Sequence, residues 1–214
     1  IFFFLFPTPE YSHVSRFEDV YEPREDSFLL LDALEKDYKF LFSLKPDVCL
    51  EIGSGSGVVI TFLASILGQD VHYIATDINP NACICTQETA RRNGVTVSAL
   101  NTNMIVGCRF SGTFKVDVLM FNPPYVATPS CEMSDSGIST AWAGGKRGRE
   151  VMDKLFPIVP NILSENGVFY LLVLDENKPD EIHDIMSSYG LVTTTVLRRR
   201  ARNENLSVLK ISRH

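Results

Sequence analysis

The chain has 214 residues, 45% of them apolar, with a formal net charge of −6 and a sequence pI of about 5.2. This length and composition are typical of one domain with one large core, and the acidic balance argues against a protein that binds free DNA or RNA through its phosphates. The same charge would attract a basic partner.

Five cysteines, an odd number without C-x-x-C spacing, argue against a disulfide framework and favour reduced thiols in the cytosol or nucleus. Cys83 and Cys85 would lie about 200° apart on a helix, so they cannot converge on one ion. We therefore expect no metal site in this chain.

Residues 1–6 are all apolar, lack an initiator methionine and precede Pro7. Six residues are far fewer than the roughly 20 that a membrane-spanning helix needs. Two interpretations stay open for this stretch: a truncated start, or a remnant of a signal or apolar docking arm. We expect residues 1–20 to form an N-terminal arm and residues 21–214 to form a single domain.

A proline, acidic residues and apolar residues at helical spacing predict an amphipathic helix from Pro23 to about Lys39. Strands separated by helices follow, which predicts an α/β fold with a parallel, doubly wound sheet and ligands at the carboxyl ends of its strands. The expected strands are Val48–Ile52, Val71–Ala75, Val95–Leu100, Val116–Phe121 and Val168–Leu174. The expected helices are Val59–Leu67, Asn81–Asn93, Glu150–Leu163 and Asp180–Tyr189. The tail, Leu191–Leu197 and Leu206–Ile211, reads as an antiparallel hairpin.

The strand Val48–Ile52 runs directly into three glycines, Gly53, Gly55 and Gly57. Glycines let the backbone turn sharply beside a ligand, and the next helix offers its N-terminus to a negatively charged group. The dinucleotide pattern G-x-G-x-x-G would need a glycine where Val58 stands, which argues against an oxidoreductase. The alternative reading is close packing of helix and strand without a ligand.

Two carboxylates lie in or at the end of apolar strands. Asp77 follows the second strand, where a carboxylate can bind both hydroxyls of a ribose. Glu51 lies within the first strand, and a buried carboxylate needs a partner. A cationic, hydroxyl-rich ligand would supply one, whereas solvated strand ends are the plain alternative.

The tetrapeptide Asn122, Pro123, Pro124 and Tyr125 follows the apolar run Val116–Phe121. The Asn side-chain oxygen and the carbonyl next to it form a pair of acceptors for the NH2 of a planar amide or amine. The prolines fix the backbone and remove two N–H donors, and the tyrosine ring can cover the bound group. A rigid turn at the end of a strand is the alternative interpretation.

The polar stretch Val126–Arg147 is long for a loop in a compact domain, and such loops usually serve a site. We interpret it as a flap over the substrate. Trp142 would either pack the flap down or line the acceptor cleft. The run Arg198–Arg200 with Arg202 is interpreted as a solvated face of the hairpin, with contact to ribosomal RNA as the alternative.

Together, the acid-glycine motif, Asp77 and the Asn-Pro-Pro-Tyr motif resemble class I S-adenosylmethionine-dependent methyltransferases of the HemK type. Two further stretches, Tyr21–Leu30 and Ala141–Asp153, resemble the eukaryotic HemK-like enzymes that methylate the glutamine of the Gly-Gly-Gln motif in the translation termination factor. The resemblance covers roughly residues 12 to 212. It implies a Rossmann-like, seven-stranded, mostly parallel sheet that ends in an antiparallel hairpin, and S-adenosylmethionine as cofactor.

The resemblance also assigns roles to individual residues. Ser27 matches a position where a hydroxyl contacts the methionine end of the cofactor, with local helix capping as the alternative. Asn103 stands where the family has an Asp that accepts a hydrogen bond from the adenine amino group. Asn122 would contact both the cofactor and the acceptor, and Asn122 to Tyr125 would form the catalytic motif.

A partner is implied as well. In the resembling family a small zinc-binding activator subunit adds a strand beside the sheet, and Val95–Leu100 would be the unprotected edge strand that receives it. Protein glutamine methylation is the first hypothesis for the reaction. Histone H4 lysine methylation, adenine N6 methylation and a non-catalytic cofactor-binding scaffold are the alternatives.

Overall fold

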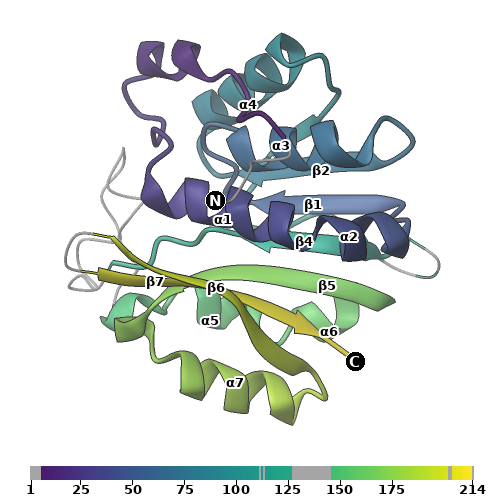
Figure 1. Cartoon of the computed structure of the whole chain (residues 1–214), viewed down its shortest axis with the longest axis vertical. Helices are drawn as coiled ribbons and strands as arrows, with labels where there is room; N and C mark the ends of the chain where they lie inside the picture. Colours follow the sequence, from purple (N-terminus) through teal and green to yellow (C-terminus); the bar gives the residue numbers. More distant parts are fainter. Residues whose placement is uncertain (1–5, 111, 113, 127–145, 202–203, 214) are drawn as a thin grey trace.

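The computed structural model describes residues 6–110, 112, 114–126, 146–201 and 204–213. These residues form one seven-stranded sheet in the order β3-β2-β1-β4-β5-β7-β6 (Figure 1). The strands are β1 Val48–Ile52, β2 His72–Asp77, β3 Ser98–Asn101, β4 Val116–Phe121, β5 Leu163–Leu174, β6 Val192–Ala201 and β7 Glu204–Ser212. Strands β1 to β5 pair in parallel, whereas β7 is antiparallel to both β5 and β6. The predicted fold class and C-terminal hairpin are therefore confirmed.

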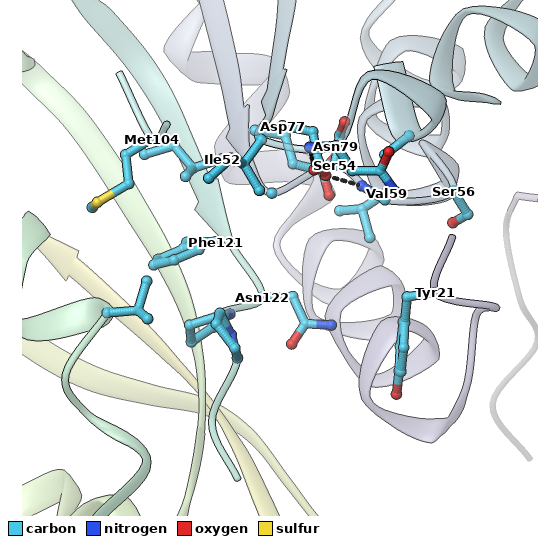
Figure 2. A pocket seen from close by; sticks show the side chains of 18 of the residues that line it. Tyr21, Ile52, Ser54, Ser56, Val59, Asp77, Asn79, Met104, Phe121 and Asn122 are labelled. Atoms are coloured by element: carbon cyan, nitrogen blue, oxygen red, sulfur yellow. Dashed lines mark hydrogen bonds between the residues drawn. The ribbon is translucent and has the colours of Figure 1, made fainter. Parts of the chain in front are cut away.

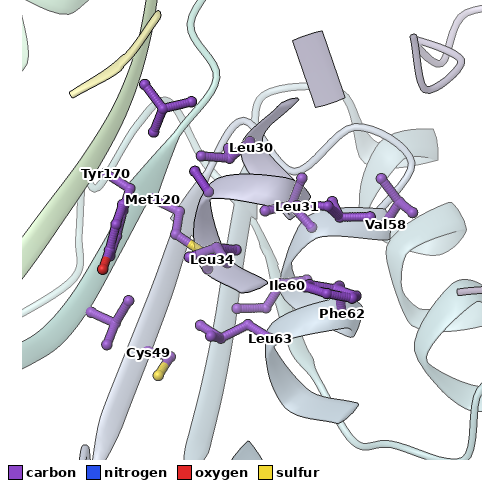
Figure 3. Packing of buried hydrophobic residues seen from close by; sticks show 14 of the residues in the cluster. Leu30, Leu31, Leu34, Cys49, Val58, Ile60, Phe62, Leu63, Met120 and Tyr170 are labelled. Atoms are coloured by element: carbon purple, nitrogen blue, oxygen red, sulfur yellow. The ribbon is translucent and has the colours of Figure 1, made fainter. Parts of the chain in front are cut away.

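Helices cover both faces of the sheet. They are α1 Glu25–Lys36, α2 Tyr38–Leu44, α3 Val58–Leu67, α4 Pro80–Arg92, α5 Met152–Leu155, α6 Val159–Ile162 and α7 Pro179–Ser188, with short 3-10 turns at Ser12–Arg16, Lys146–Gly148 and Asp175–Asn177. On one face α1 and α3 contribute buried leucines and isoleucines, and Figure 3 shows Leu34, Ile60 and Leu63 among them. On the other face α5, α6 and α7 bury Leu155, Ile162 and Ile182. Each face thus carries its own apolar core.

The register of β1 places the site. Ile52, its last residue, lies opposite Thr76 of β2 and Phe121 of β4. The connections after these strands therefore begin at the same edge of the sheet. Strand order also reverses beside β1, and ligands of open α/β sheets bind at such a switch point.

The helix predicted over Glu150–Leu163 is wrong as a single element. The structure has two four-residue helices, α5 and α6, and Leu163 already begins β5. Pro157 and Pro160 explain the break, because a proline inside a helix lacks the N–H donor and clashes with the preceding turn. Pro160 instead lies in the first turn of α6, where proline is tolerated.

The expected edge strand Val95–Leu100 is shorter than predicted. Val95 N–H still donates to the Ala90 carbonyl of α4 (3.0 Å), and Gly94 has a φ of +70°. The chain is therefore still leaving the helix at Val95. Pairing with β2 begins only at Ser98, which lies opposite Ile74.

Part of the described N-terminal stretch packs on α4, whereas Phe6 contacts the rings of Tyr38 and Phe62. Val14 and Val20 are buried against Ala82 and Cys85, and the ring of His13 contacts the Thr89 hydroxyl at 2.9 Å. Residues 1–5 lie outside the described residues. Among the described helices none is long and apolar enough to cross a membrane.

Asn177 holds together two distant parts of the chain. Its side chain is fully buried, and its oxygen accepts the Leu174 N–H at 2.7 Å. Its NH2 donates to the carbonyls of Tyr125 (3.0 Å) and Arg147 (2.9 Å). The backbones at Tyr125 and Gly148 lie so close together that a Cβ on Gly148 would be 1.8 Å from the Tyr125 carbonyl oxygen. Asn177 therefore fixes the backbone on both sides of residues 127–145.

Replacing Asn177 with Ala should lower the free energy of unfolding by about 2–4 kcal/mol, because it leaves one N–H and two carbonyls buried without their partner. Urea unfolding of the purified protein measures this change. Asn161→Ala is the matched control, since Asn161 is exposed and its loss should cost no more than about 0.5 kcal/mol. Equal losses for the two variants would contradict the role assigned to Asn177.

Candidate active site

The glycine loop after β1 is held against the end of β2. Gly53 and Ser54 both donate their N–H groups to the Thr76 carbonyl, at 2.8 and 3.1 Å. Gly53 and Gly55 have φ values of +66° and +49°, a region that residues with a Cβ rarely adopt. The loop is therefore rigid and needs glycine at these positions.

Gly57 serves a different purpose in the same loop. A Cβ at this position would lie 2.6 Å from the Thr86 Cα of α4, and φ is +75°. The Ser54 hydroxyl lies 2.9 Å from the Thr86 hydroxyl and ties the loop further to α4. Gly57 thus allows close packing between the loop and α4.

Asp77 lies at the carboxyl end of β2 and contacts the loop directly. One oxygen accepts the Gly55 N–H and the other accepts the Asn79 N–H, each at 2.9 Å. Burial raises the pKa of Asp77, and the hydrogen bonds from Asn79 and Gly55 oppose this shift. Carboxylate oxygens can accept more than one hydrogen bond each, so Asp77 can also accept from a ligand hydroxyl.

Asn122 lies directly across from the glycine loop, because it follows Phe121, the partner of Ile52. Its NH2 donates to the Asp26 carboxylate at 3.0 Å. Its side-chain oxygen is buried and has no hydrogen-bond partner among the residues that the structure describes. Buried acceptors are seldom left unpaired, so this oxygen is a candidate ligand-binding atom.

These elements line one cavity of about 510 Å³. Figure 2 shows Asp77 and Asn79 on one side of it and Phe121 and Asn122 facing them from the other. The glycine loop, β2, the start of α1 and the Asn-Pro-Pro-Tyr segment all contribute to its wall. The arrangement joins a hydroxyl-binding carboxylate to an acceptor that can hold an NH2 group.

Comparison with known proteins identifies the family. The model described as "Methyltransferase small domain" matches residues 25–135. The chain is 53% identical over 210 residues to human methyltransferase HEMK2, with 97% of each chain covered. It is 37% identical over 222 residues to the eRF1 methyltransferase catalytic subunit mtq2 of Schizosaccharomyces pombe, with 97% of this chain and 95% of the relative covered.

The chain belongs to the HemK-type methyltransferases. A solved structure, the E. cuniculi Mtq2-Trm112 complex, is described as responsible for methylation of the eRF1 translation termination factor. Its matching chain is 26% identical, with a TM-score of 0.68 over 92% of this methyltransferase and 99% of that chain.

The fold brings nearly all the predicted site residues of this methyltransferase to the cavity. Those that line it are Ser27, Glu51, Gly53, Gly55, Asp77, Asn103, Asn122, Pro123, Pro124 and Tyr125. Gly57 is the exception, since it is absent from the cavity wall and packs on Thr86. Ser27 is not the N-cap of α1, which is Arg24, so the capping alternative for Ser27 has no support in the structure.

Glu51 has a structural partner that its sequence position did not reveal. Its carboxylate accepts the Ile60 N–H of α3 at 2.9 Å, which satisfies a backbone donor in the first turn of that helix. Burial raises the pKa of Glu51 well above its usual value, the Ile60 bond opposes this shift, and the charge of Asp77 adds to it. The methyltransferase thus keeps two carboxyl groups with raised pKa values near each other at the base of the cavity.

Three residues that shape the site, Asp26, Tyr21 and Asn177, were not predicted from the sequence. Asp26 is 3% exposed and accepts hydrogen bonds from the hydroxyls of Tyr21 (3.1 Å) and Tyr125 (3.0 Å) as well as from Asn122. Burial and the Asp26 charge raise the pKa of both tyrosines. The signal was present, because Asp26 and Tyr21 belong to the stretch Tyr21–Leu30 that carried the family resemblance.

Most of the proposed flap Val126–Arg147, namely residues 127–145 with Trp142 and Cys131, lies outside the described residues. Within the described ranges no three His, Cys, Asp or Glu residues are grouped so that they could hold a metal ion. The thiols of Cys83 and Cys85 contact different groups, the Asp77 carbonyl and the His13 ring. Two of the predicted hairpin arginines form ion pairs, Arg198 with Asp175 and Arg199 with Asp32.

Glu51→Gln should change how stability depends on pH. The pKa of Glu51 is raised above 4.5 in the folded protein, so above pH 4.5 the unfolded chain releases a proton that the folded chain keeps. Stability is therefore lost as pH rises through this window, at up to about 1.4 kcal/mol per pH unit. Glutamine cannot titrate and keeps an oxygen for the Ile60 N–H, so the variant should lose less stability between pH 4.5 and 7.

Urea unfolding across this pH range measures the difference between the two proteins. Asp77 titrates in both, so the difference isolates Glu51. Parallel curves for the variant and the unmodified protein would contradict this account.

Proposed function

We propose that this methyltransferase transfers a methyl group from S-adenosylmethionine to the glutamine side-chain amide of the Gly-Gly-Gln motif in the eukaryotic translation termination factor. The observation that carries the proposal is the side-chain oxygen of Asn122, which is buried, has no hydrogen-bond partner among the described residues and follows the strand that pairs with β1. The names of the S. pombe relative and of the E. cuniculi complex, both tied to eRF1, support the choice of acceptor.

The cavity suits S-adenosylmethionine. Gly53 and Gly55 add no side chain to the cavity wall, so their backbone can approach a ligand closely, and the Asp77 carboxylate can accept from the two ribose hydroxyls. Asn103 is exposed at the cavity wall, where its oxygen can accept from the adenine amino group, and Ser27 lies near the site for the methionine end. When bound, the cofactor supplies a methyl group on a positively charged sulfur, and the carboxylates around the cavity favour that charge.

The residues of the Asn-Pro-Pro-Tyr segment aim the acceptor. The oxygen of Asn122 and the carbonyl of Pro123 would accept the two hydrogens of the glutamine NH2. Pro123 and Pro124 have no N–H donors, so the turn presents only acceptors there. The Tyr125 ring would pack against the amide plane, with its hydroxyl held by Asp26 at 3.0 Å.

These two hydrogen bonds to the glutamine NH2 would allow the reaction to proceed without a strong general base. An amide nitrogen is a poor nucleophile because its lone pair is delocalised, and two acceptors favour the more tetrahedral nitrogen that forms as the new N–C bond replaces the C–S bond. The methylated amide then carries a positive charge and loses its proton readily. Orientation of such an in-line transfer can be worth about 7–11 kcal/mol of barrier.

Incubating the purified protein with labelled S-adenosylmethionine and three separate acceptors tests the proposal. We expect label on the termination factor carrying the Gly-Gly-Gln motif and none on the same factor with Gln replaced by Ala. Histone H4 is the second acceptor, favoured by the net charge of −6, which attracts a basic tail. Adenine-containing DNA is the third, and label on DNA alone would overturn the proposal.

Asn122→Ala is the matched loss-of-function variant for this assay. It should reduce transfer by at least about 100-fold, because the acceptor loses a hydrogen bond that is strongest in the transition state. Cofactor affinity, measured by calorimetry, should stay within a few fold. A variant with nearly full turnover would remove the role assigned to Asn122.

We further propose that a small zinc-binding activator subunit pairs with the exposed edge of β3. Leu100 on this strand and the nearby Val106 and Phe114 are 43%, 71% and 44% exposed, so an apolar surface accompanies the open edge. The presence of Trm112 in the E. cuniculi complex supports a small partner of this kind.

We also propose that the enzyme works in the cytosol and nucleus. Free, buried cysteine thiols such as those of Cys49 and Cys85 agree with these reducing compartments.

Leu100→Asp tests this surface. It places a charge on the exposed edge strand and should reduce recovery of the activator in co-purification by about tenfold or more. Val192→Asp is the matched control, because Val192 is 51% exposed on β6, at the opposite edge of the sheet. Equal recovery with both variants would place the partner elsewhere.

A further inference from the structure

Asp26 is surrounded by donors from three separate parts of the chain. Its Oδ1 accepts the N–H of Ser27 at 2.7 Å within α1. Its Oδ2 accepts from the Tyr21 hydroxyl before α1 (3.1 Å), and from the Asn122 amide and Tyr125 hydroxyl after β4 (3.0 Å each). A carboxylate that is 3% exposed is costly to bury unless it is hydrogen-bonded, and these four donors offset that cost.

This carboxylate decides which way the Asn122 amide faces. A carboxylate oxygen can only accept, so the Asn122 group next to it must be the NH2 and not the oxygen. Turning the amide by 180° would bring two oxygens together at the same 3.0 Å separation. Asp26 therefore fixes the NH2 end of the Asn122 amide and leaves its oxygen, which is buried and has no partner among the described residues, as the end that can accept from a ligand at the cavity wall.

We propose that Asp26 is a positioning residue that locks the Asn122 oxygen and the Tyr125 ring in the geometry that receives an NH2 group. The inference rests on the proposed function and adds a residue and a reason to it. Because Asp26 occupies the NH2 end of Asn122 and leaves the oxygen as the open acceptor, the site selects substrates that carry N–H donors there, such as an amide or a neutral amine. An acceptor that offers only oxygen, such as the glutamate counterpart of the same motif, is refused.

Asp26→Asn is the informative variant. The new side chain can keep its oxygen on the Ser27 N–H only if its NH2 faces Tyr21, Asn122 and Tyr125. The tyrosine hydroxyls can rotate to accept from this NH2, but Asn122 can accept only by turning its own oxygen inward. Its NH2 would then face the NH2 of the acceptor, and donors would oppose donors.

We expect Asp26→Asn to lower kcat/KM for the acceptor by about 100-fold, similar to the loss of one preorganised hydrogen bond in the transition state. Affinity for S-adenosylmethionine should change by less than about threefold, since the change acts on the acceptor side. Asp32→Asn is the matched control on the same helix. Asp32 pairs with Arg199 away from the cavity, so this variant should keep full activity.

A double-mutant cycle separates positioning from a general structural role. If Asp26 acts mainly through Asn122, Asp26→Asn should cost no more than about threefold in a protein that already carries Asn122→Ala, the remainder being its effect on Tyr125. Losses that multiply, or a more than tenfold weaker cofactor affinity with kcat unchanged, would overturn the inference. Activity within about threefold of the unmodified protein would overturn it as well.

If Asp26→Asn does not fold, nuclear magnetic resonance on the unmodified protein still tests whether Asp26 holds the Asn122 amide. In the unmodified protein the Asn122 NH2 signal, identified by its disappearance in Asn122→Ala, should be shifted downfield and slow to exchange with water. A signal typical of a solvent-exposed Asn side chain would overturn the inference. This readout needs no acceptor, so it stays valid if the termination factor proves not to be the substrate, an outcome that the acceptor assay reports separately.

Discussion

The parallel pairing of β1 with β4 is the constraint on which the site depends. Ile52 and Phe121 lie opposite each other at the ends of these strands, so the chain leaves the sheet at the same level on both. The glycine loop begins at one exit and the Asn-Pro-Pro-Tyr segment at the other. A shift of this register would separate the two halves of the cavity, although every local motif would remain intact.

Three buried or partly buried carboxylates hydrogen-bond to the segments that form the two halves of the cavity. Asp77 binds the backbone of the glycine loop, and Glu51 binds the first turn of α3. Asp26 binds the side chains of Asn122 and Tyr125 in the Asn-Pro-Pro-Tyr segment. Each takes donors that would otherwise be unpaired, and each makes the surrounding geometry more rigid. Some acidic residues of this enzyme thus lie inside the protein, where their hydrogen bonds fix the shape of the site.

Rigidity also explains why the Asn122 oxygen can remain unpaired. A buried acceptor without a partner costs free energy, and a mobile side chain would turn to find one. The Asn122 NH2 donates to Asp26, and the prolines that follow fix the backbone, so the amide cannot turn its oxygen toward another donor among the described residues. Under our proposal, this cost is offset when an NH2 group binds, as in a preorganised site.

Local patterns in the sequence determined much of this protein. The strands Val48–Ile52 and Val116–Phe121 were predicted with their observed bounds, because each is a short, mostly apolar run that stops at a turn signal, Gly53 in one case and Asn122-Pro123 in the other. The site motifs could be read because turns that need glycine, and acceptors that need Asn and Pro, restrict residue type strongly. The helix over Glu150–Leu163 and the edge strand Val95–Leu100 were the errors, since helix continuity across prolines and the entry of a strand into a sheet depend on packing.

Only the tertiary structure decided which polar groups meet. Asp26 and Asn122 are 96 positions apart, and Asn177 and Tyr125 are 52 apart, so no spacing rule connects them. Likewise, the spacing of the glycines does not reveal that Gly57 packs against Thr86 of α4, where no Cβ would fit. A sequence specifies the chemistry that each residue can offer, whereas burial and strand register select the partner that uses it.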